Sequence, residues 1–195
     1  MVAIISKQSD LNFMPGSQYL YSNTNYILLA LIIEKASGES FVNYTNKMFK
    51  LLGMNATSFE DESKKIAGPI ARAYFNFNTW TTFKWIWNVC GDGNLFSTLN
   101  DQIRWESIVQ GKIQSSISPA IIRKSQQPVE GILMSGYGYG LEKANYRGLS
   151  YQFHEGATGA WKATVLRFPS KAISIICFTN SGKTIPSMQS RQMAD

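Results

Sequence analysis

The chain has 195 residues, of which 44% are hydrophobic and 13% aromatic, enough apolar material for one domain or a little more with a substantial core. With only 16% charged residues, this composition excludes an intrinsically disordered chain. The net charge of +6 comes from scattered lysines and arginines, with Lys64-Lys65 and Arg123-Lys124 as the densest pairs, so the sequence argues against a nucleic-acid partner.

Metal ions, cofactors and membrane segments are also not expected. Two cysteines far apart in the sequence and a single histidine fit no metal-ligand spacing, so we expect no metal site and no cofactor. The longest apolar run, residues 26–33, is too short to span a bilayer. No basic segment followed by an apolar one opens the chain, so no signal peptide is visible.

Two consecutive helices are predicted near the start of the chain. Residues 26–36 are apolar on nearly all sides, which predicts a helix that starts at about Asn23 and is buried on most sides. Gly38 can adopt the left-handed conformation that ends such a helix. Ser40 can cap the next helix, which Gly53 ends.

Residues 54–96 contain no long periodic segment but many aromatic side chains. They are interpreted either as a long loop packed by its own rings or as one wall of a substrate cleft. The residues concerned are Tyr74, Phe75, Phe77, Trp80, Phe83, Trp85 and Trp87.

Two further helices and a group of strands complete the pattern. Thr98, with Asp101 three residues on, predicts a helix to Gln110, and Pro119 fits the first position of another helix that Pro128 ends. Short segments rich in β-branched and aromatic residues then predict four antiparallel strands, the last of them apolar enough to be central. These segments are residues 136–144, 150–154, 161–168 and 172–179, followed by a last helix over 185–193.

Tyr21 and Asn23 lie in a polar turn before the first apolar helix. A tyrosine can act as a general base if a cation lowers its pKa from about 10. The alternative is structural, since a tyrosine beside a helix-capping asparagine is common. His154 ends a predicted strand, and Gly156 and Gly159 after it let a ligand approach the backbone. A lone histidine can equally be a hydrogen-bonded structural residue.

Several ordered blocks of sequence resemble the serine β-lactamase and penicillin-binding-protein family, in the branch of class C β-lactamases, D-alanyl-D-alanine carboxypeptidases and esterases. The blocks begin at Phe13 and run to the end of the chain. They are F-x-P-G-x-x-x-x-Y-S-N-x-x-Y-x-L-L, I-I-E-K-A-S-G, L-G-M-x-x-T, G-D-G-N-L-F-S-T-L-N-D, G-Y-G-Y-G, H-E-G and F-T-N.

The resemblance implies a role for each candidate residue. Tyr21 matches the tyrosine that partners a nucleophilic serine, and Asn23 matches the asparagine that contacts substrate. His154 to Gly156 look like the K-T-G or H-x-G strand motif, with the amide of Ala157 as an oxyanion-hole donor. Glu155 is a departure from that motif, but in an extended strand it points away from His154.

The family's nucleophile motif is a larger departure. No serine in this chain has a lysine three residues later, so S-x-x-K, whose lysine helps to deprotonate the serine, is absent. We therefore expect an α+β fold with an antiparallel sheet packed with helices, lacking the N-terminal strands and the nucleophile helix. Within this partial domain, residues 20–130 would be mainly helical and loop, 134–182 strands, and 184–195 a truncated helix.

The resulting hypothesis is a fragment of a serine hydrolase that transfers acyl groups from a β-lactam, a D-alanine peptide or an ester, inactive alone. The alternative is a non-catalytic binding or assembly module that uses the same pocket. Exposed surfaces of a half-fold would favour self-association. The resemblance implies an extracytoplasmic, bacterial protein with a small-molecule or peptidoglycan-peptide substrate.

Overall fold

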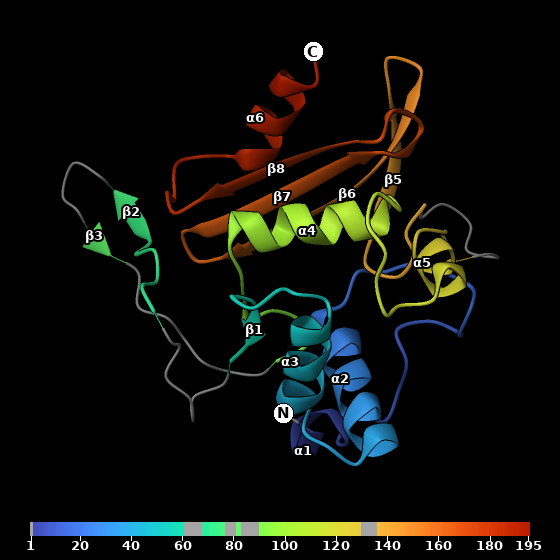
Figure 1. The fold of residues 1–195 in the computed structure, drawn as a ribbon. Coiled ribbons are helices and arrows are strands. Elements are labelled where there is room, and N and C mark those ends of the chain that lie inside the picture. Colours follow the sequence, from blue (N-terminus) through green and yellow to red (C-terminus); the bar gives the residue numbers. More distant parts are fainter. Residues whose placement is uncertain (1, 61–67, 77–80, 83–89, 130–135) are drawn as a thin grey trace.

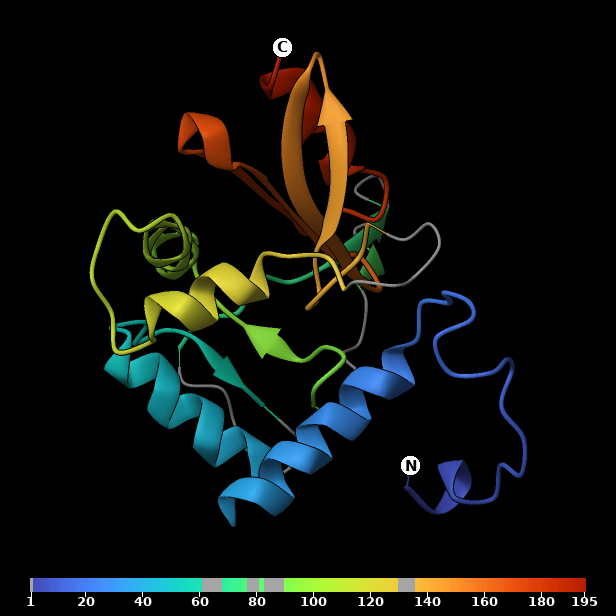
Figure 2. The ribbon, with the colours of Figure 1, turned by 90° about the vertical axis from the view of Figure 1, so that its right-hand side faces the viewer.

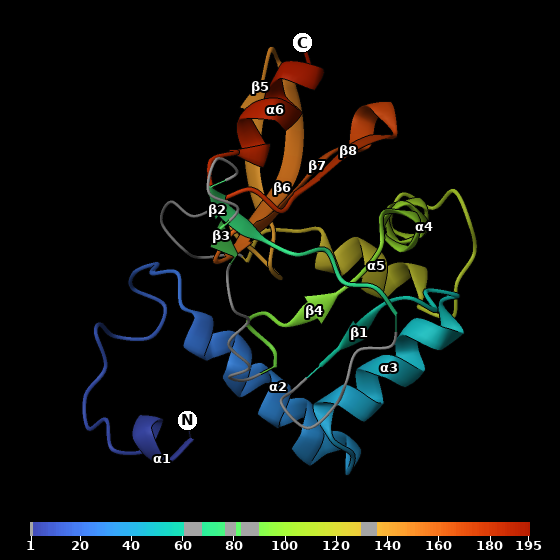
Figure 3. The same ribbon diagram turned by 90° about the vertical axis from the view of Figure 1, so that its left-hand side faces the viewer.

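The computed structural model describes residues 2–60, 68–76, 81–82, 90–129 and 136–195. Its largest sheet has four antiparallel strands in the order β5, β6, β7, β8. Their bounds are β5 Glu142–Tyr146, β6 Leu149–Thr158, β7 Trp161–Phe168 and β8 Ile173–Thr179. Helix α4 lies on one side of β7 and β8 and helix α6 on the other (Figures 1 and 3). The predicted α+β fold with an antiparallel sheet packed with helices is confirmed.

Two tight hairpins set the register of this sheet. Tyr146 pairs with Leu149 across a turn in which Arg147 and Gly148 have φ angles of 49° and 79°, the left-handed conformation of a type I′ turn. Thr158 pairs with Trp161 across a second two-residue turn. Strands β7 and β8 are joined by a 3₁₀ turn, Pro169–Lys171.

The first two long helices begin and end where their capping residues predict. Helix α2 is Asn23–Ser37 and ends at Gly38, whose φ is 73°. Helix α3 is Phe41–Leu51, and the Ser40 hydroxyl accepts a hydrogen bond from the Asn43 amide at 3.3 Å. Both predicted helices are therefore confirmed, together with the caps that position them.

The burial predicted for α2 is wrong. Ile27 and Ala30 are buried, but Leu29 is 50% exposed and Ile32 60% exposed. One stripe of the helix packs on the protein and another faces solvent, although both are apolar. The residue pattern showed the length of the helix but could not show which neighbours cover it.

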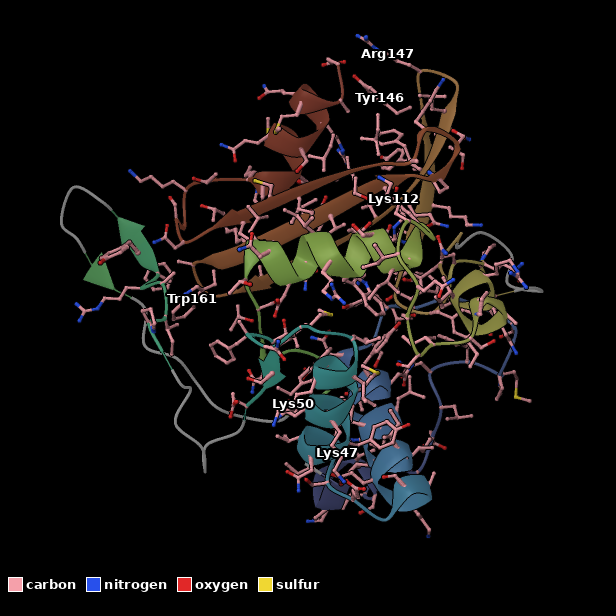
Figure 4. The ribbon with its side chains drawn as sticks, viewed as in Figure 1. Lys47, Lys50, Lys112, Tyr146, Arg147 and Trp161 are labelled. Carbon is pink, nitrogen blue, oxygen red and sulfur yellow. The ribbon has the colours of Figure 1, made fainter. Side chains whose placement is uncertain are left out.

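Helix α4, Leu99–Val109, joins the helical region to the sheet. Its N-cap, Thr98, accepts a hydrogen bond from the Asp101 amide at 3.2 Å, as the capping pattern predicts. At the other end, Lys112 Nζ donates to the Ala172 carbonyl at 2.6 Å, and Figure 4 shows Lys112 where α4 ends. One core cluster, formed by Phe49, Leu52, Met54 and Ile108, fixes α3 against α4.

The remaining elements are short. They are α1 Val2–Ile5, β1 Ser58–Phe59, β2 Tyr74–Asn76, β3 Thr81–Thr82, β4 Leu95–Phe96, α5 Pro119–Ser125 and α6 Pro186–Met193. Strand β1 pairs with β4, and β2 pairs with β3. Trp161 Nε1 donates to the Ala71 carbonyl at 2.6 Å and so links the sheet to the segment before β2 (Figure 4). Five of the seven aromatic residues of the proposed cleft wall, at 77, 80, 83, 85 and 87, lie outside the described residues. No described helix is long and apolar enough to cross a membrane.

Two predictions about strands are wrong. The segment 136–140 is not part of β5, because Gly136, Tyr139 and Gly140 have positive φ angles of 52°, 51° and 82° and form a turn. Strand β8 is not central: among the described strands it lies at the edge of the sheet. Ile173 in β8 is 52% exposed, which is unusual for a strand of this composition.

Candidate active site

Three side chains from distant parts of the sequence form a hydrogen-bonded line. Tyr26 comes from α2, Tyr137 from the turn before β5, and His154 from β6. The hydroxyl oxygens of Tyr26 and Tyr137 are 3.0 Å apart, and Tyr137 Oη is 3.5 Å from His154 Nε2. Figure 2 shows the β5–β6 hairpin in front and the N-terminal end of α2 reaching toward its base.

Tyr21 lies against this line. Its ring centroid is 6.3 Å from that of His154 and 6.1 Å from that of Tyr137, with the latter pair edge to face. The ring of Tyr19 packs on Tyr137 from another side, at 5.5 Å between centroids. The structure thus brings together Tyr21 and His154, which the sequence placed at opposite ends of the chain.

Glycines permit the close packing that builds this cluster. A Cβ atom at Gly91 would lie 2.9 Å from both Ala30 Cβ and the Tyr26 carbonyl oxygen, so the loop before β4 contacts α2 directly. Beside Tyr137, a Cβ at Gly138 would lie 2.4 Å from the Gln127 carbonyl oxygen. Both positions need a residue without a side chain.

We predict that Gly138→Ala lowers the free energy of unfolding by about 1–3 kcal/mol, because the added methyl group meets backbone atoms that must move. Gly93→Ala is the matched control, since a Cβ there meets nothing within 4 Å. Urea unfolding of both variants checks the prediction. Equal urea midpoints of unfolding for the two variants would show that the close contact at Gly138 does not affect stability.

The electrostatic environment disfavours an ionised phenol. Burial raises the pKa of Tyr21, and its neighbours Tyr26, Asp92 and Glu142 raise it further. Burial raises the pKa of Tyr137 even more strongly, and the hydrogen bond with Tyr26 adds to the effect. The cation that would lower the pKa of Tyr21 is therefore not among the groups that act on it here.

Neither Asn23 nor Glu155 takes part in the hydrogen bonds described for this cluster. Asn23 is exposed at the start of α2 and forms no hydrogen bond with another described side chain. Glu155 Oε1 is 3.8 Å from Arg191 of α6. His154 points to the other face of the sheet, toward Tyr137, so the prediction that Glu155 points away from His154 is confirmed.

Gly156 and Ala157 lie in β6 beyond the end of β5. In each hairpin, the two residues that flank the two-residue turn form a hydrogen-bonded pair. Along β6, the N–H and C=O groups of odd-numbered residues therefore point toward β5, and those of even-numbered residues point toward β7. Strand β5 ends its pairing at Phe153, so the amide of Ala157 lies on an edge that no described strand covers. An N–H at such an edge can donate to a ligand.

A cavity of about 210 Å³ lies on the α6 face of the sheet. Gly156, Ala157 and Ser187 are among the residues that line it, whereas Tyr21 and His154 are not. The structure therefore brings Tyr21 and His154 together but does not place Gly156 and Ala157 in one cavity with them. In the part of the chain that the structure describes, no group of three His, Cys, Asp or Glu side chains could hold a metal ion.

Tyr26 and Tyr137 are site residues that the sequence reasoning did not single out. Tyr26 follows Tyr21 by five positions in the Y-S-N-x-x-Y block, and Tyr137 is flanked by glycines in G-Y-G-Y-G. A large aromatic residue between two glycines is the signal that could have indicated Tyr137.

The structure is that of an α+β protein with an antiparallel sheet packed with helices and with phenols and an imidazole gathered beside strand β6. The sequence profile of the Beta-lactamase family matches residues 4–195. The chain therefore belongs to this family.

Two individual proteins are also similar to this chain. The chain is 26% identical over 185 residues to a D-aminopeptidase of Gluconobacter oxydans, which covers 91% of this chain and 34% of that protein. It is 43% identical over 68 residues to the mitochondrial serine beta-lactamase-like protein of Mus musculus, covering 35% of this chain and 12% of the other.

Among solved structures, the octameric penicillin-binding protein homologue from Pyrococcus abyssi is similar to this chain. The two superpose with a TM-score of 0.77 at 28% identity, covering 93% of this chain and 43% of that one. The chain thus spans about a third of the length of the D-aminopeptidase and less than half of the penicillin-binding protein homologue.

Proposed function

We propose that this chain contributes one side of the acyl-transfer site of a serine hydrolase, with a nucleophile that these 195 residues do not supply. The observation that carries the proposal is the packing of Tyr21 against His154 at 6.3 Å between ring centroids. A phenol and an imidazole at this separation can contact one small substrate from two sides.

Tyr21 is proposed as the proton shuttle to and from the attacking serine. The surrounding groups raise the pKa of Tyr21, so this role requires a nearby positive charge. An opposite charge within about 4–6 Å lowers a pKa by about 1–3 units. The lysine of an S-x-x-K motif, one helical turn after the serine, would supply that charge together with the nucleophile.

The other candidates are proposed to bind and orient the substrate. Asn23, exposed beside Tyr21, would hold the acyl amide. The Ala157 amide on the open edge of β6 would donate to the oxyanion, beside Gly156, whose missing side chain leaves room for the acyl group. His154 would place the substrate's carboxylate or carbonyl.

The proposed substrate is a β-lactam, a peptide ending in D-alanine, or an ester. The D-aminopeptidase relative, similar over 91% of this chain, favours amides of D-amino acids as the first compounds to examine. A β-lactam is the other natural test compound, since the family takes its name from hydrolysis of that ring.

Ligand binding tests the proposal without requiring turnover. The chain has a single histidine, so imidazole ¹H–¹⁵N resonances report His154 alone. We expect N-acetyl-D-alanyl-D-alanine to shift these resonances, and the L,L isomer at the same concentration to leave them unchanged. Tyr21→Ala should weaken binding about tenfold, equivalent to about 1.4 kcal/mol.

Tyr139→Phe is the control, because Tyr139 lies in the same turn as Tyr137 but is 53% exposed. It should bind the D,D dipeptide like the unsubstituted chain. Equal shifts with both stereoisomers, or full binding by Tyr21→Ala, would remove the basis for a stereospecific site between Tyr21 and His154.

A further inference from the structure

We propose that Tyr26 and Tyr137 are positioning residues that hold His154 as its Nδ1–H tautomer, leaving Nδ1–H as the donor that meets the ligand. The inference rests on the proposed function, in which His154 contacts the substrate. Tyr26 and Tyr137, which have no other role in the proposed reaction, would position His154 through their hydrogen bonds.

The number of available protons limits how these three side chains can bond to one another. Each phenol has one hydrogen to donate, and a neutral imidazole has one N–H and one acceptor nitrogen. Tyr26 Oη and Tyr137 Oη are 3.0 Å apart, and Tyr137 Oη is 3.5 Å from His154 Nε2. Two continuous arrangements satisfy this line: Tyr26 donates to Tyr137 and Tyr137 to Nε2, or His154 Nε2–H donates to Tyr137 and Tyr137 to Tyr26.

Acid and base strength favours the first arrangement. A phenol is a stronger hydrogen-bond acid than a neutral imidazole N–H, and an imidazole nitrogen is a better acceptor than a phenol oxygen. The first arrangement pairs the better donor, Tyr137 O–H, with the better acceptor, Nε2. Nε2 then has no hydrogen, and the imidazole hydrogen must lie on Nδ1.

The surroundings keep Tyr137 in the form that donates. Burial and the hydrogen bond with Tyr26 raise the pKa of Tyr137, so its hydroxyl stays protonated at neutral pH. The backbone on both sides of the ring is fixed, since the Tyr137 carbonyl accepts from the Val129 amide at 3.2 Å and Gly138 exchanges hydrogen bonds with Leu141. The ring of Tyr137 therefore presents its hydroxyl to Nε2 from a constrained turn.

The consequence is a histidine that works as a neutral donor. An imidazole N–H can polarise a carbonyl or hold a carboxylate without carrying a charge. With Nε2 accepting from Tyr137, a proton can bind there only if both hydroxyls turn and the two hydrogen bonds reverse direction. The geometry thus assigns proton transfer to Tyr21 and hydrogen-bond donation to His154.

Imidazole ¹⁵N spectra of the purified 195-residue chain test the tautomer directly, because it contains one histidine. We expect the Nδ1–H form to predominate at a pH where the ring is neutral. Tyr137→Phe should make Nε2–H the major form, and Tyr26→Phe should shift the ratio in the same direction by a smaller amount. Tyr139→Phe should leave the spectrum unchanged.

A predominant Nε2–H form in the unsubstituted chain would overturn the proposal, as would the same ratio in Tyr137→Phe. If Tyr137→Phe fails to give a cooperative thermal unfolding transition, Tyr26→Phe decides: an unchanged ratio in that variant also overturns it. The spectra need no substrate, so a missing tautomer preference and a missing hydrolytic activity are separate results.

Discussion

Glu106→Ala is expected to lower the free energy of unfolding by about 3–5 kcal/mol, because it leaves a guanidinium buried without its counter-ion. Arg167 donates from Nε to Glu106 Oε2 at 2.7 Å and from its terminal nitrogen to Oε1 at 2.5 Å. The two side chains are only 4% and 5% exposed. Ser174 donates to the same carboxylate, so one change breaks contacts between α4, β7 and β8.

Urea unfolding measures this effect, and an exposed ion pair provides the control. Lys47 Nζ and Glu39 Oε2 are 2.6 Å apart, but the two side chains are 66% and 37% exposed. Glu39→Ala should therefore change stability by less than about 1 kcal/mol.

The double variant Glu106→Leu with Arg167→Met separates the two contributions. Because it removes both charges from the interior, it should recover most of the stability lost in Glu106→Ala. Equal losses for Glu106→Ala and Glu39→Ala would contradict the importance of the buried pair.

Local signals were the predictable part of this fold. The end of α2 and the starts of α3 and α4 could be predicted from their capping residues, Gly38, Ser40 and Thr98. A cap acts through neighbouring backbone groups, so its signal is local in the sequence. The Glu106–Arg167 pair could not be predicted in this way. The two residues are 61 positions apart, and nothing in either segment indicates that they meet in the interior.

The errors arose where one pattern fits two conformations. Alternation in G-Y-G-Y-G has the period of a strand, but Gly136 and Gly140 use the left-handed region and form a turn. The apolar composition of β8 and α2 predicts burial. Which neighbour covers an apolar face is decided by tertiary packing, and here Leu29 and Ile173 remain half exposed.

The candidate site was predicted in outline from the family resemblance. Tyr21 and His154 were placed together because the blocks that contain them occur in a known order, and the structure brings their rings within 6.3 Å. Tyr26 and Tyr137 were missed because hydrogen bonds between hydroxyls leave no periodic trace in a sequence. Their roles become visible only when distances between side chains are known.

The 195-residue chain alone is expected to hydrolyse neither nitrocefin nor a p-nitrophenyl ester above the rate in buffer. No serine has a lysine three residues later, so the family's nucleophile is absent from this sequence. In the serine-hydrolase template, loss of the nucleophile lowers kcat by about a millionfold. The groups around Tyr21 raise its pKa, so less phenolate is present at neutral pH to accept a proton.

The matched comparison is between the 195-residue chain and any longer product of the same gene that carries S-x-x-K, each with and without Tyr21→Phe. Where hydrolysis is found in such a product, Tyr21→Phe should lower kcat/KM by about 10²- to 10⁴-fold, the usual contribution of a positioned proton-transfer group. Binding of the D,D dipeptide without turnover would favour a non-catalytic binding protein that uses the same pocket. Hydrolysis by the 195 residues themselves, abolished by Tyr21→Phe, would refute the prediction, because it would require a nucleophile among serines that lack the lysine partner.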